Sequence, residues 1–379
     1  MSKVPSQSVT HPWQDGEWPE LDRLTTHLAT EILVIGAGIA GLTTAYLLAK
    51  DGREVAVIDA SNPGDGETGN TSAHLSSALD EHFYNLEELF GLDGSLLAAK
   101  SHRSAIDAIE AICEQEHIEC QFERVNGFLF SAKPADDDMI SKEFDAAKRA
   151  DFKGIELGSR IPFEGFINAL ALRFPRQAQF QPILYLQGLT RAIRRQGVKI
   201  YTHCEAVEIE GETTLKVHTR DRHVIKAQHV VVATNTPMNN RFTIHTKQSP
   251  YRTYVVAFEI EKDIVPKGLY WDTEDPYHYV RTHELNDHQS LLIVGGEDHK
   301  VGQTHDAEVC WSRLEDWTRE NIPVAGAVVK KWSGQVMEPV DGLAFIGRNP
   351  GDSNVYIATG DSGHGLTHGT IAGIIISDL

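Results

Sequence analysis

The sequence predicts an α/β fold, with one domain built on a central parallel sheet and a second domain of mixed or antiparallel strands. Three observations predict it. Residues 31–60 read as a buried strand, a glycine-rich turn, a helix and a second buried strand. Two more fully apolar strands, at residues 229–233 and 355–359, come much later and are expected to return to the same sheet. Strand-like segments between residues 254 and 295 are expected to form the antiparallel sheet of the other domain.

The first unit opens with a β-branched-rich run, residues 32–35, that is too short for a helix and is bounded by glycine. The turn that follows contains Gly36, Gly38 and Gly41 in a GxGxxG pattern. In such a turn the first glycine makes the tight bend, the second lets a pyrophosphate approach the backbone, and the third lets helix and strand pack closely. The free amides and the dipole at the start of the helix favour an anion there.

The second strand of this unit ends at Asp59, about 20 residues past the glycines, where an acid can accept hydrogen bonds from an adenosine ribose. A glycine pattern alone is weak evidence, but here strand, turn, helix, strand and acid follow in the right order. The unit therefore predicts a Rossmann-like dinucleotide site. The alternative is a strand–helix–strand unit in which the glycine turn is incidental.

The remaining elements are predicted in chain order from composition and periodicity. Residues 61–80 are rich in Gly, Ser, Thr and Asn and predict a long loop, and loops of that length in compact proteins tend to be functional. A glycine-rich segment and an apolar helical start follow residues 355–359. We expect helices at residues 84–116, 136–150, 182–196 and 370–376, strands at 122–131 and 198–201, and a hairpin over 207–227.

The parallel-sheet domain is thus expected to come from three separated pieces of the chain. Nicotinamide dehydrogenases usually build their nucleotide domain contiguously, so this layout disfavours an NAD(P)-dependent dehydrogenase. The chain also lacks the second GxGxxG that two-nucleotide reductases carry. The expected boundaries are an N-terminal arm over residues 1–30, a dinucleotide-binding domain over 31–105, 178–247 and 325–379, and a substrate domain over 106–177 and 248–324.

Composition excludes several classes of partner. The formal net charge of -19 argues against nucleic acid and anionic membranes, which demand a basic face. No stretch approaches the roughly 18 consecutive apolar residues of a membrane span, and residues 1–30 do not resemble a secretory signal. The four cysteines lie far apart in the sequence and fit neither a zinc spacing nor a disulfide framework, which predicts a reduced, cytoplasmic setting and no metal site. They are Cys113, Cys120, Cys204 and Cys310.

Four blocks resemble the FAD-dependent oxidoreductases of the D-amino-acid oxidase, glycine oxidase and sarcosine oxidase superfamily, in the order of that family. They are GAGIAG with Asp59, ETGNTSAHLSSAL (67–79), KKWSGQVMEPVDGLAFIG (330–347) and IATGDSGHGLTHGTIAG (357–373). The resemblance covers nearly everything from residue 31 onward and is strongest with bacterial members that carry a C-terminal Rieske iron–sulfur domain. This chain has no Rieske-type Cys-x-His pairs, so we expect a shorter homologue or a truncated product.

The resemblance implies an enzyme that oxidises the C–N bond of an amine or amino acid by hydride transfer to FAD. The partners that it implies are a small-molecule substrate and an electron acceptor, either oxygen or a redox protein. The alternative is an electron-transfer flavoprotein module that serves an iron–sulfur or other redox partner and has little substrate turnover of its own.

The resemblance also implies which residues surround FAD. In some relatives a histidine at the position of His74 is bonded covalently to the flavin, and in others the loop only contacts the ring. A solvent-facing His74 is the third alternative, and for Thr71 and Ser72 the alternative to pyrophosphate contact is helix capping. The expected set is Gly36, Gly38, Ile39, Ala40, Gly41, Asp59, Ala60, Thr71, Ser72, His74, Leu75, Val207, Ala233, Thr234, Trp332, Gly360, Gly363, His364, Gly365, Leu366 and Thr367.

The substrate-binding residues depart from the pattern of the family. Several glycine and D-amino-acid oxidases place an arginine for the substrate carboxylate after a Trp-x-Gly-x string, where this chain has Val336. Either another cation binds the carboxylate or the substrate lacks one. Arg281 and Arg252 are the candidate replacements, and Tyr279 and Tyr254 are candidate walls for an amine. The alternative for the two arginines is a position on the surface, and the alternative for the two tyrosines is a position in the core or at an interface.

Overall fold

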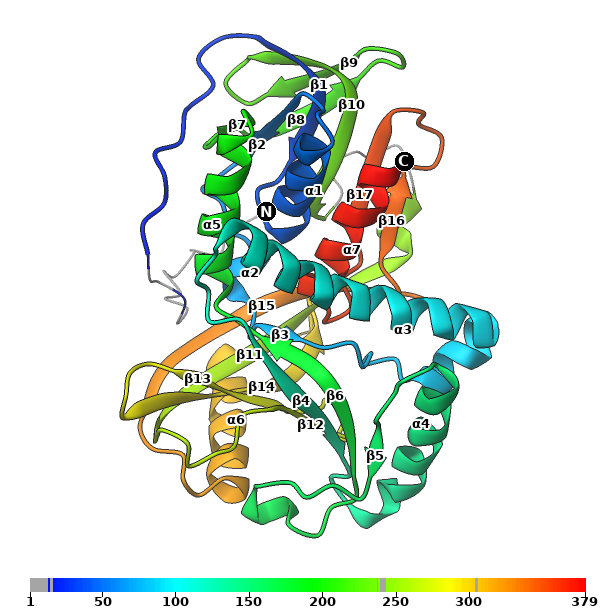
Figure 1. The fold of residues 1–379 in the computed structure, drawn as a ribbon, viewed down its shortest axis with the longest axis vertical. Coiled ribbons are helices and arrows are strands. Elements are labelled where there is room, and N and C mark those ends of the chain that lie inside the picture. The colour runs from blue at the N-terminus through cyan, green and yellow to red at the C-terminus, as the bar shows by residue number, and fades with distance from the viewer. Residues whose placement is uncertain (1–12, 14–15, 237, 239–242, 304–305) are drawn as a thin grey trace.

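Two sheets organise the molecule, one in each lobe of Figure 1. The structure is a computed structural model and describes residues 13, 16–236, 238, 243–303 and 306–379. The upper sheet, here called the parallel sheet, contains segments from the beginning, the middle and the end of the chain. The lower sheet, here called the mixed sheet, contains the strands in between.

The parallel sheet is made of β1 (Leu28–Ile35), β2 (Val55–Ile58), β7 (Lys199–Tyr201), β8 (Ala206–Glu210), β9 (Leu215–Thr219), β10 (Val224–Asn235), β16 (Phe345–Arg348) and β17 (Val355–Thr359). Its order is β16-β17-β10-β1-β2-β7, and all neighbours from β17 to β7 pair in parallel. β16 joins the edge antiparallel, and the β8–β9 hairpin extends from β10. The late apolar strands do return to the sheet of β1, as the sequence predicts.

Both faces of the parallel sheet are covered, which explains the apolar runs in its central strands. Ile32 of β1 belongs to the core on one side, together with three helices. The next residue, Leu33, belongs to the core on the other side, with Leu215 of β9. The three helices are α1 (Ile39–Lys50), α5 (Pro182–Arg195) and α7 (Gly365–Asp378).

The mixed sheet is made of β3 (His74–Leu75), β4 (Glu123–Phe130), β5 (Glu156–Leu157), β6 (Ala171–Gln179), β11 (Gln248–Glu261), β12 (Leu269–Asp272), β13 (Tyr279–Glu284), β14 (Gln289–Lys300) and β15 (Val328–Pro339). Its order is β15-β11-β14-β13-β12-β4-β6-β3, with β5 paired to β6. Only the pair β12–β4 is parallel among its described pairings. One face packs against α6 (Ala307–Asn321), through Trp311 and Leu314.

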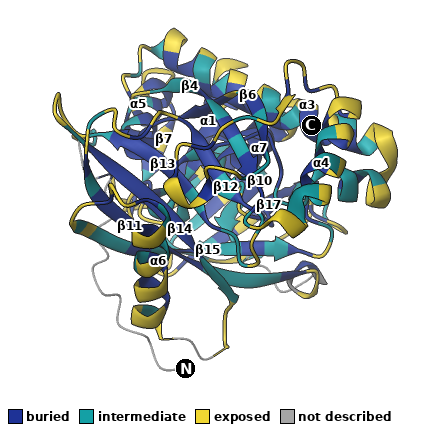
Figure 2. Cartoon of the chain, turned by 90° about the horizontal axis from the view of Figure 1, so that it is seen from below, coloured by how far each residue is buried: buried dark blue, intermediate teal, exposed yellow. Residues whose placement is uncertain are grey.

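A long helix, α3 (Phe83–Glu116), crosses the molecule between the two lobes in Figure 1. Its axis breaks at Gly91, whose backbone has φ 72° and ψ 175°. Figure 2 shows the buried strands at the centre and the exposed turns of the helices at the periphery. The remaining helices are α2 (Glu67–Asn70) and α4 (Asp137–Arg149), with short 3₁₀ turns at Pro134–Asp136, Glu164–Phe166 and Thr243–Thr246.

Several expectations from the sequence need correction. The long loop at residues 61–80 contains α2 and β3, and the C-terminal helix begins at Gly365 and not at Thr370. β6, α6 and β15 were not predicted. Cys113 and Cys120 are not apart in space, because their Sγ atoms lie 3.5 Å from each other. They lie close together because α3 ends between them and the chain turns back. Both thiols are free and buried.

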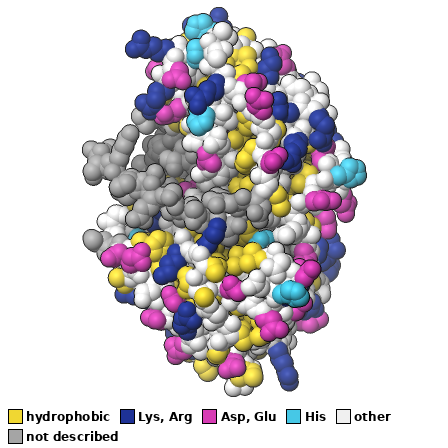
Figure 3. Space-filling model, turned by 90° about the vertical axis from the view of Figure 1, so that its left-hand side faces the viewer, with side chains coloured by type: hydrophobic (Ala, Val, Ile, Leu, Met, Phe, Trp, Pro, Cys, Tyr) yellow, Lys and Arg dark blue, Asp and Glu magenta, His cyan; other side chains and the backbone are white. Residues whose placement is uncertain are grey.

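The surface carries both signs of charge. Figure 3 shows Lys and Arg interspersed with Asp and Glu on one face, without a basic patch in the part of that face that is described. Every helix in the described ranges is too short or too polar to cross a bilayer.

Candidate active site

A cavity of about 880 Å³ lies where the two sheets meet. The parallel sheet contributes residues at the carboxyl ends of its strands, among them Ile35 of β1 and Thr359 of β17. The mixed sheet contributes Thr253, Tyr279 and Gln335. Open α/β sheets bind ligands at the carboxyl ends of their strands, where neighbouring connections diverge, so the cavity is at the expected place for a nucleotide.

The glycine turn after β1 is shaped by three different constraints. Gly36 has φ +108°, and a Cβ there would lie 2.3 Å from the carbonyl oxygen of Ala233. A Cβ on Gly41 would lie 1.9 Å from the carbonyl oxygen of Gly36. Gly38 is different, because a Cβ there would meet only Thr68 Oγ1, at 3.0 Å. Gly36 and Gly41 are therefore fixed by the fold, whereas Gly38 faces open space in the cavity.

Asp59 follows β2 and closes the other side of this turn. Its Oδ2 accepts a hydrogen bond from the amide of Ala37 at 2.6 Å, and its Oδ1 accepts one from the amide of Ser61 at 2.8 Å. Burial raises the pKa of Asp59, and these two amides partly offset the effect. Because each carboxylate oxygen has further lone pairs, Asp59 can still accept hydrogen bonds from a ligand in the cavity.

His74 on β3 enters the cavity from the mixed sheet. Its Nδ1 lies 3.0 Å from Ser72 Oγ, and its ring meets the Tyr279 ring edge-on at 5.4 Å. Its Nε2 is buried and has no hydrogen-bond partner among the described residues. Burial, together with the nearby charge of Arg281, lowers the pKa of His74 to about 3. His74 is thus a neutral imidazole.

A second histidine, His364, lies at the N-terminus of α7. Its Nε2 is 3.2 Å from Asp80 Oδ1, and the other oxygen of Asp80 accepts a hydrogen bond from the Tyr277 hydroxyl at 2.9 Å. Burial alone would lower the pKa of His364, but the Asp80 carboxylate outweighs burial and raises it. The same contacts lower the pKa of Asp80 against its burial. Asp80 thus favours the protonated form of His364 at the start of α7, although the Asp80 amide also lies 3.2 Å from the same Nε2.

Most of the expected site residues line this cavity. Of the four residues expected to bind the substrate, only Tyr279, on the mixed sheet, lines the cavity. The expected cofactor residues that line it are Gly36, Gly38, Ile39, Ala40, Asp59, Ala60, Thr71, Ser72, His74, Ala233, Thr234, Gly363, His364, Gly365 and Leu366.

Other expected cofactor residues lie behind the lining. Leu75 and Trp332 are buried, and the Trp332 Nε1 donates to the Asn70 carbonyl at 3.0 Å. Val207 is half-exposed outside the cavity, whereas the two residues before it, Glu205 and Ala206, line it. Gly41, Gly360 and Thr367 also do not line the cavity, although each lies beside a residue that does.

The two candidate arginines do not reach the cavity lining. Arg281 is buried and donates from Nη1 to the carbonyls of Ala73, at 2.5 Å, and Phe180, at 3.3 Å. It is thus neither a ligand of a substrate in the cavity nor a surface arginine. Arg252 donates to Ser333 Oγ at 2.9 Å, on the neighbouring strand β15. Tyr254 faces away as well, because its hydroxyl lies 3.0 Å from His299 Nε2.

Several cavity residues were not found from the sequence. They come from segments far apart in the chain, and although Glu338 and Asp361 lie inside two of the family-like blocks, no spacing singles out their carboxyl groups. They include Asp80, Tyr277, Asp298, Glu338 and Asp361.

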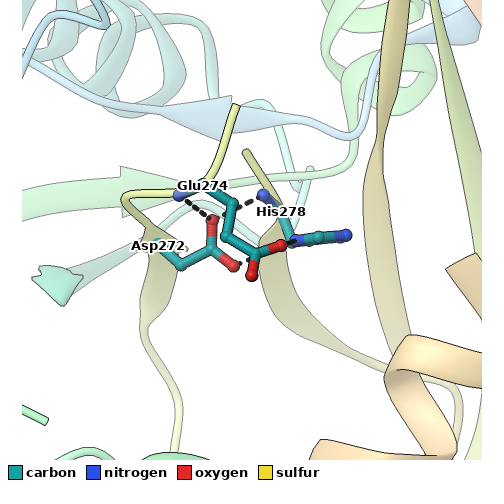
Figure 4. A group of neighbouring side chains, drawn as sticks. All are labelled: Asp272, Glu274 and His278. Carbon is teal, nitrogen blue, oxygen red and sulfur yellow. Dashed lines mark hydrogen bonds and ion pairs between the residues drawn. The ribbon is translucent and has the colours of Figure 1, made fainter. Parts of the chain in front are cut away.

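A turn next to the cavity contains a group with metal-ligand chemistry. Figure 4 shows Asp272, Glu274 and His278 pointing toward one another. Asp272 accepts hydrogen bonds from the backbone amides of Glu274 and His278, at 3.1 and 2.9 Å, and its Oδ2 is 2.9 Å from His278 Nδ1. The His278 ring stacks on Trp317 at 4.1 Å. These contacts close the turn that brings Tyr277 to the cavity.

The parallel sheet, the glycine turn and the cavity define a dinucleotide-binding protein with a second, substrate-facing sheet. The chain belongs to the DAO family of FAD-dependent oxidoreductases, whose family model matches residues 31–379. The expected fold class, FAD cofactor and oxidoreductase class are thereby confirmed.

Individual relatives are distant. The protein YhfW of Bacillus subtilis (strain 168), provisionally named a Rieske 2Fe-2S iron–sulfur protein, is 28% identical over 365 residues, which cover 95% of this chain and 70% of YhfW. Gamma-glutamylputrescine oxidoreductase of Escherichia coli (strain K12) is 22% identical over 379 residues, covering 96% of this chain and 86% of the relative. The crystal structure of glycine oxidase from Geobacillus kaustophilus superposes with a TM-score of 0.79 at 17% identity, covering 93% and 95% of the two chains.

Proposed function

We propose that this chain oxidises the C–N bond of an amine or amino acid to an imine, with hydride passing to FAD, and that water then hydrolyses the imine. The observation that carries the proposal is the single cavity shared by the dinucleotide unit and the polar, aromatic wall of the mixed sheet. The names of two similar proteins, glycine oxidase and gamma-glutamylputrescine oxidoreductase, agree with it, because glycine and gamma-glutamylputrescine both contain such a bond.

The residues of the cavity fit FAD. Open space faces Gly38 at the N-terminus of α1, where the helix dipole favours a pyrophosphate, and Thr68 Oγ1 accepts a hydrogen bond from the Ile39 amide there at 3.1 Å. Asp59, at the end of β2, is the acceptor for the adenosine ribose. His74 Nε2, which is buried without a partner among the described residues, and the turn around Gly363 border the space for the flavin ring. We assign FAD contacts to the lining residues named above.

Bound FAD supplies the two-electron acceptor. The amides at the start of α7 and the His364 side chain lie at the same edge of the cavity, where the helix dipole favours negative charge. Asp80 raises the pKa of His364, and the Tyr277 hydroxyl donates a hydrogen bond to Asp80. Tyr279 and Thr253, whose hydroxyls are 2.8 Å apart, form part of the wall against which a substrate is oriented.

A second candidate function is that of an electron-transfer flavin module for an iron–sulfur partner. The provisional name of YhfW, a Rieske iron–sulfur protein, is the observation that favours it.

Anaerobic mixing of the holoprotein with a panel of amines and amino acids separates the two. Bleaching of the visible flavin band by a substrate supports the oxidoreductase. Dithionite is the control that shows the flavin to be reducible. If a reduced iron–sulfur protein bleaches the band and no compound of the panel does, the electron-transfer function replaces the proposed one. Acid precipitation then shows whether the flavin stays attached, as a bond to His74 requires.

A further inference from the structure

The cavity contains many carboxyl groups and little positive charge. Asp80, Asp275, Asp298, Glu338 and Asp361 all line it near the mixed sheet or the start of α7. No lysine or arginine belongs to the lining in the described ranges of the chain. A substrate carboxylate would therefore meet like charge without a guanidinium to bind it.

The positions at which a cation was expected do not provide one. Val336, which lines the cavity, is apolar, and Arg281 and Arg252 donate their hydrogen bonds to protein groups outside the lining. Of the two alternatives left open by the sequence, a replacement cation or a substrate without a carboxylate, the described geometry favours the second.

Most of the cavity carboxyl groups already have partners. His364 and the Tyr277 hydroxyl contact Asp80. Glu338 accepts a hydrogen bond from Ser362 Oγ at 2.7 Å, and Asp361 accepts one from the amide of Met337 at 2.9 Å. Because these groups are satisfied, they do not require a ligand cation.

Asp298, near the end of β14, is different. It forms no ion pair with a described residue, and its Oδ1 is buried without a hydrogen-bond partner among them. Burial raises the pKa of Asp298 to about 7, the Thr253 hydroxyl lowers it in part, and the Asp80 carboxylate raises it further. A carboxyl group in this state gains most from a cation that enters the cavity.

Aromatic rings accompany Asp298. Tyr279 packs directly on Gly295, which lies on β14 as Asp298 does. A Cβ on Gly295 would lie 2.0 Å from the Tyr279 ring. The rings of Tyr277 and Tyr279 are 5.7 Å apart, and both line the cavity. Aromatic rings attract alkylammonium groups through their negative faces, so a carboxylate with such rings is suited to an ammonium.

Resting on the proposed function, we propose that the substrate is an aliphatic diamine, or an amine with a second ammonium group, that lacks a carboxylate, and that Asp298 binds the second ammonium. The reacting nitrogen is neutral. Its α carbon loses one hydride to FAD, which leaves an iminium ion. Water converts the iminium to an aldehyde and ammonium, and the nitrogen bound by Asp298 is unchanged.

Three compounds with a four-carbon chain test the proposal: butane-1,4-diamine, butan-1-amine and 4-aminobutanoate. They differ only at the distal carbon, which bears an ammonium, is a methyl group or is a carboxylate. Anaerobic flavin reduction in the holoprotein is expected to be fastest with the diamine and about tenfold or more slower with 4-aminobutanoate. Equal or faster reduction by 4-aminobutanoate overturns the inference while leaving C–N oxidation intact. If no amine reduces the flavin, both proposals fail.

Binding is measured separately by calorimetry on dithionite-reduced holoprotein, which cannot accept a further hydride. Asp298→Asn is expected to weaken the binding of butane-1,4-diamine by about tenfold and to change the affinity for butan-1-amine by less than about twofold. Asp287→Asn, the same change at an exposed site between β13 and β14, is the matched control and is expected to alter neither. Unchanged diamine affinity in Asp298→Asn, or an equal loss for both amines, overturns the assignment of Asp298.

Discussion

Arg281 is a buried cation that contacts backbone carbonyls and, among the described residues, no carboxylate. Burial lowers its pKa to about 9, so it remains charged at neutral pH. Its guanidinium lies 5.5 Å from the Trp13 ring and fixes the backbone at Ala73, which adopts φ 62° just before His74. Its role is therefore to position the segment that carries His74.

Replacing Arg281 by methionine is expected to destabilise the apoprotein by about 2–3 kcal/mol, because buried carbonyls lose a charged donor. Denaturant unfolding measures the change. The matched control is Arg252→Met, which removes a hydrogen bond to Ser333 Oγ and is expected to cost about 1 kcal/mol. Equal losses in the two variants would contradict the positioning role.

A substitution at Gly38 is expected to remove the cofactor without changing the stability of the apoprotein. A valine there projects into the cavity, while its Cβ is close only to Thr68 Oγ1. Gly38→Val is expected to melt near the wild-type apoprotein but to retain less than about a tenth of the flavin. Lys50→Val, at the exposed end of α1, is the control. Stoichiometric flavin in Gly38→Val would remove the pyrophosphate from this turn.

Glu143 of α4 shows how one element supports the start of another. It is buried and accepts hydrogen bonds from the amides of Phe83 and Tyr84, at 3.0 and 3.4 Å, in the first turn of α3. Burial raises its pKa to about 8, against the effect of these amides. The folded state thus favours the protonated acid, so stability from this group is lost as pH rises from about 4.5 to 8.

The melting temperature of the wild type should therefore fall more between pH 5 and pH 8 than that of Glu143→Gln. Thermal unfolding at both pH values measures the difference. Glu88→Gln, an exposed change on α3, is expected to follow the wild type. An equal fall of the melting temperature in Glu143→Gln and in the wild type would show that Glu143 does not contribute to the pH dependence of stability between pH 5 and pH 8.

The kink in α3 depends on Gly91. Nothing lies within 4 Å of a Cβ at this position, so only the left-handed backbone opposes a side chain. Gly91→Ala is expected to cost about 1–2 kcal/mol in denaturant unfolding. Gly66 has similar open space but an ordinary φ of -87°, so Gly66→Ala is the control and is expected to change stability by less than about 0.5 kcal/mol.

Elements with a strong local signal were predicted well. The central parts of β1, β10 and β17, residues 32–35, 230–232 and 355–358, are covered on both faces and are therefore apolar. β6 contains Pro175 and Arg176, and in β15 two lysines, Lys330 and Lys331, follow the first two valines, so neither shows an apolar run or clean alternation. Their strand structure comes from pairing with β4 and β11, which is tertiary information.

The same distinction holds for the site across the whole molecule. The dinucleotide side could be predicted because a contiguous unit, residues 31–60, contains most of it. The substrate wall could not, because its contacts join remote segments: Tyr277 and Asp80, which share a hydrogen bond, are 197 residues apart in the chain. Arg281 was misplaced because strand alternation fixes a face and not the depth along it, whereas Arg252 lies on the other face of β11 from Tyr251 and Thr253, which line the cavity.

Helices from the two ends of the chain pack closely against each other. A Cβ on Gly373 of α7 would lie 2.7 Å from Thr43 Cγ2 and 3.1 Å from the Thr43 backbone in α1. Gly373→Ala is expected to destabilise the apoprotein by about 1–3 kcal/mol through overpacking and to weaken FAD retention. Ile375→Ala, at a partly exposed position on the same helix, is the control for flavin content. Unchanged unfolding of Gly373→Ala would contradict this close packing.

This packing has a consequence for biosynthesis. While the protein is being translated, α1 and β10 emerge long before their neighbours α7 and β17, and their apolar surfaces stay uncovered. The lining of the cofactor cavity cannot be completed until synthesis has passed Gly369. We therefore expect nascent chains to engage chaperones until that point, and flavin to load only after it.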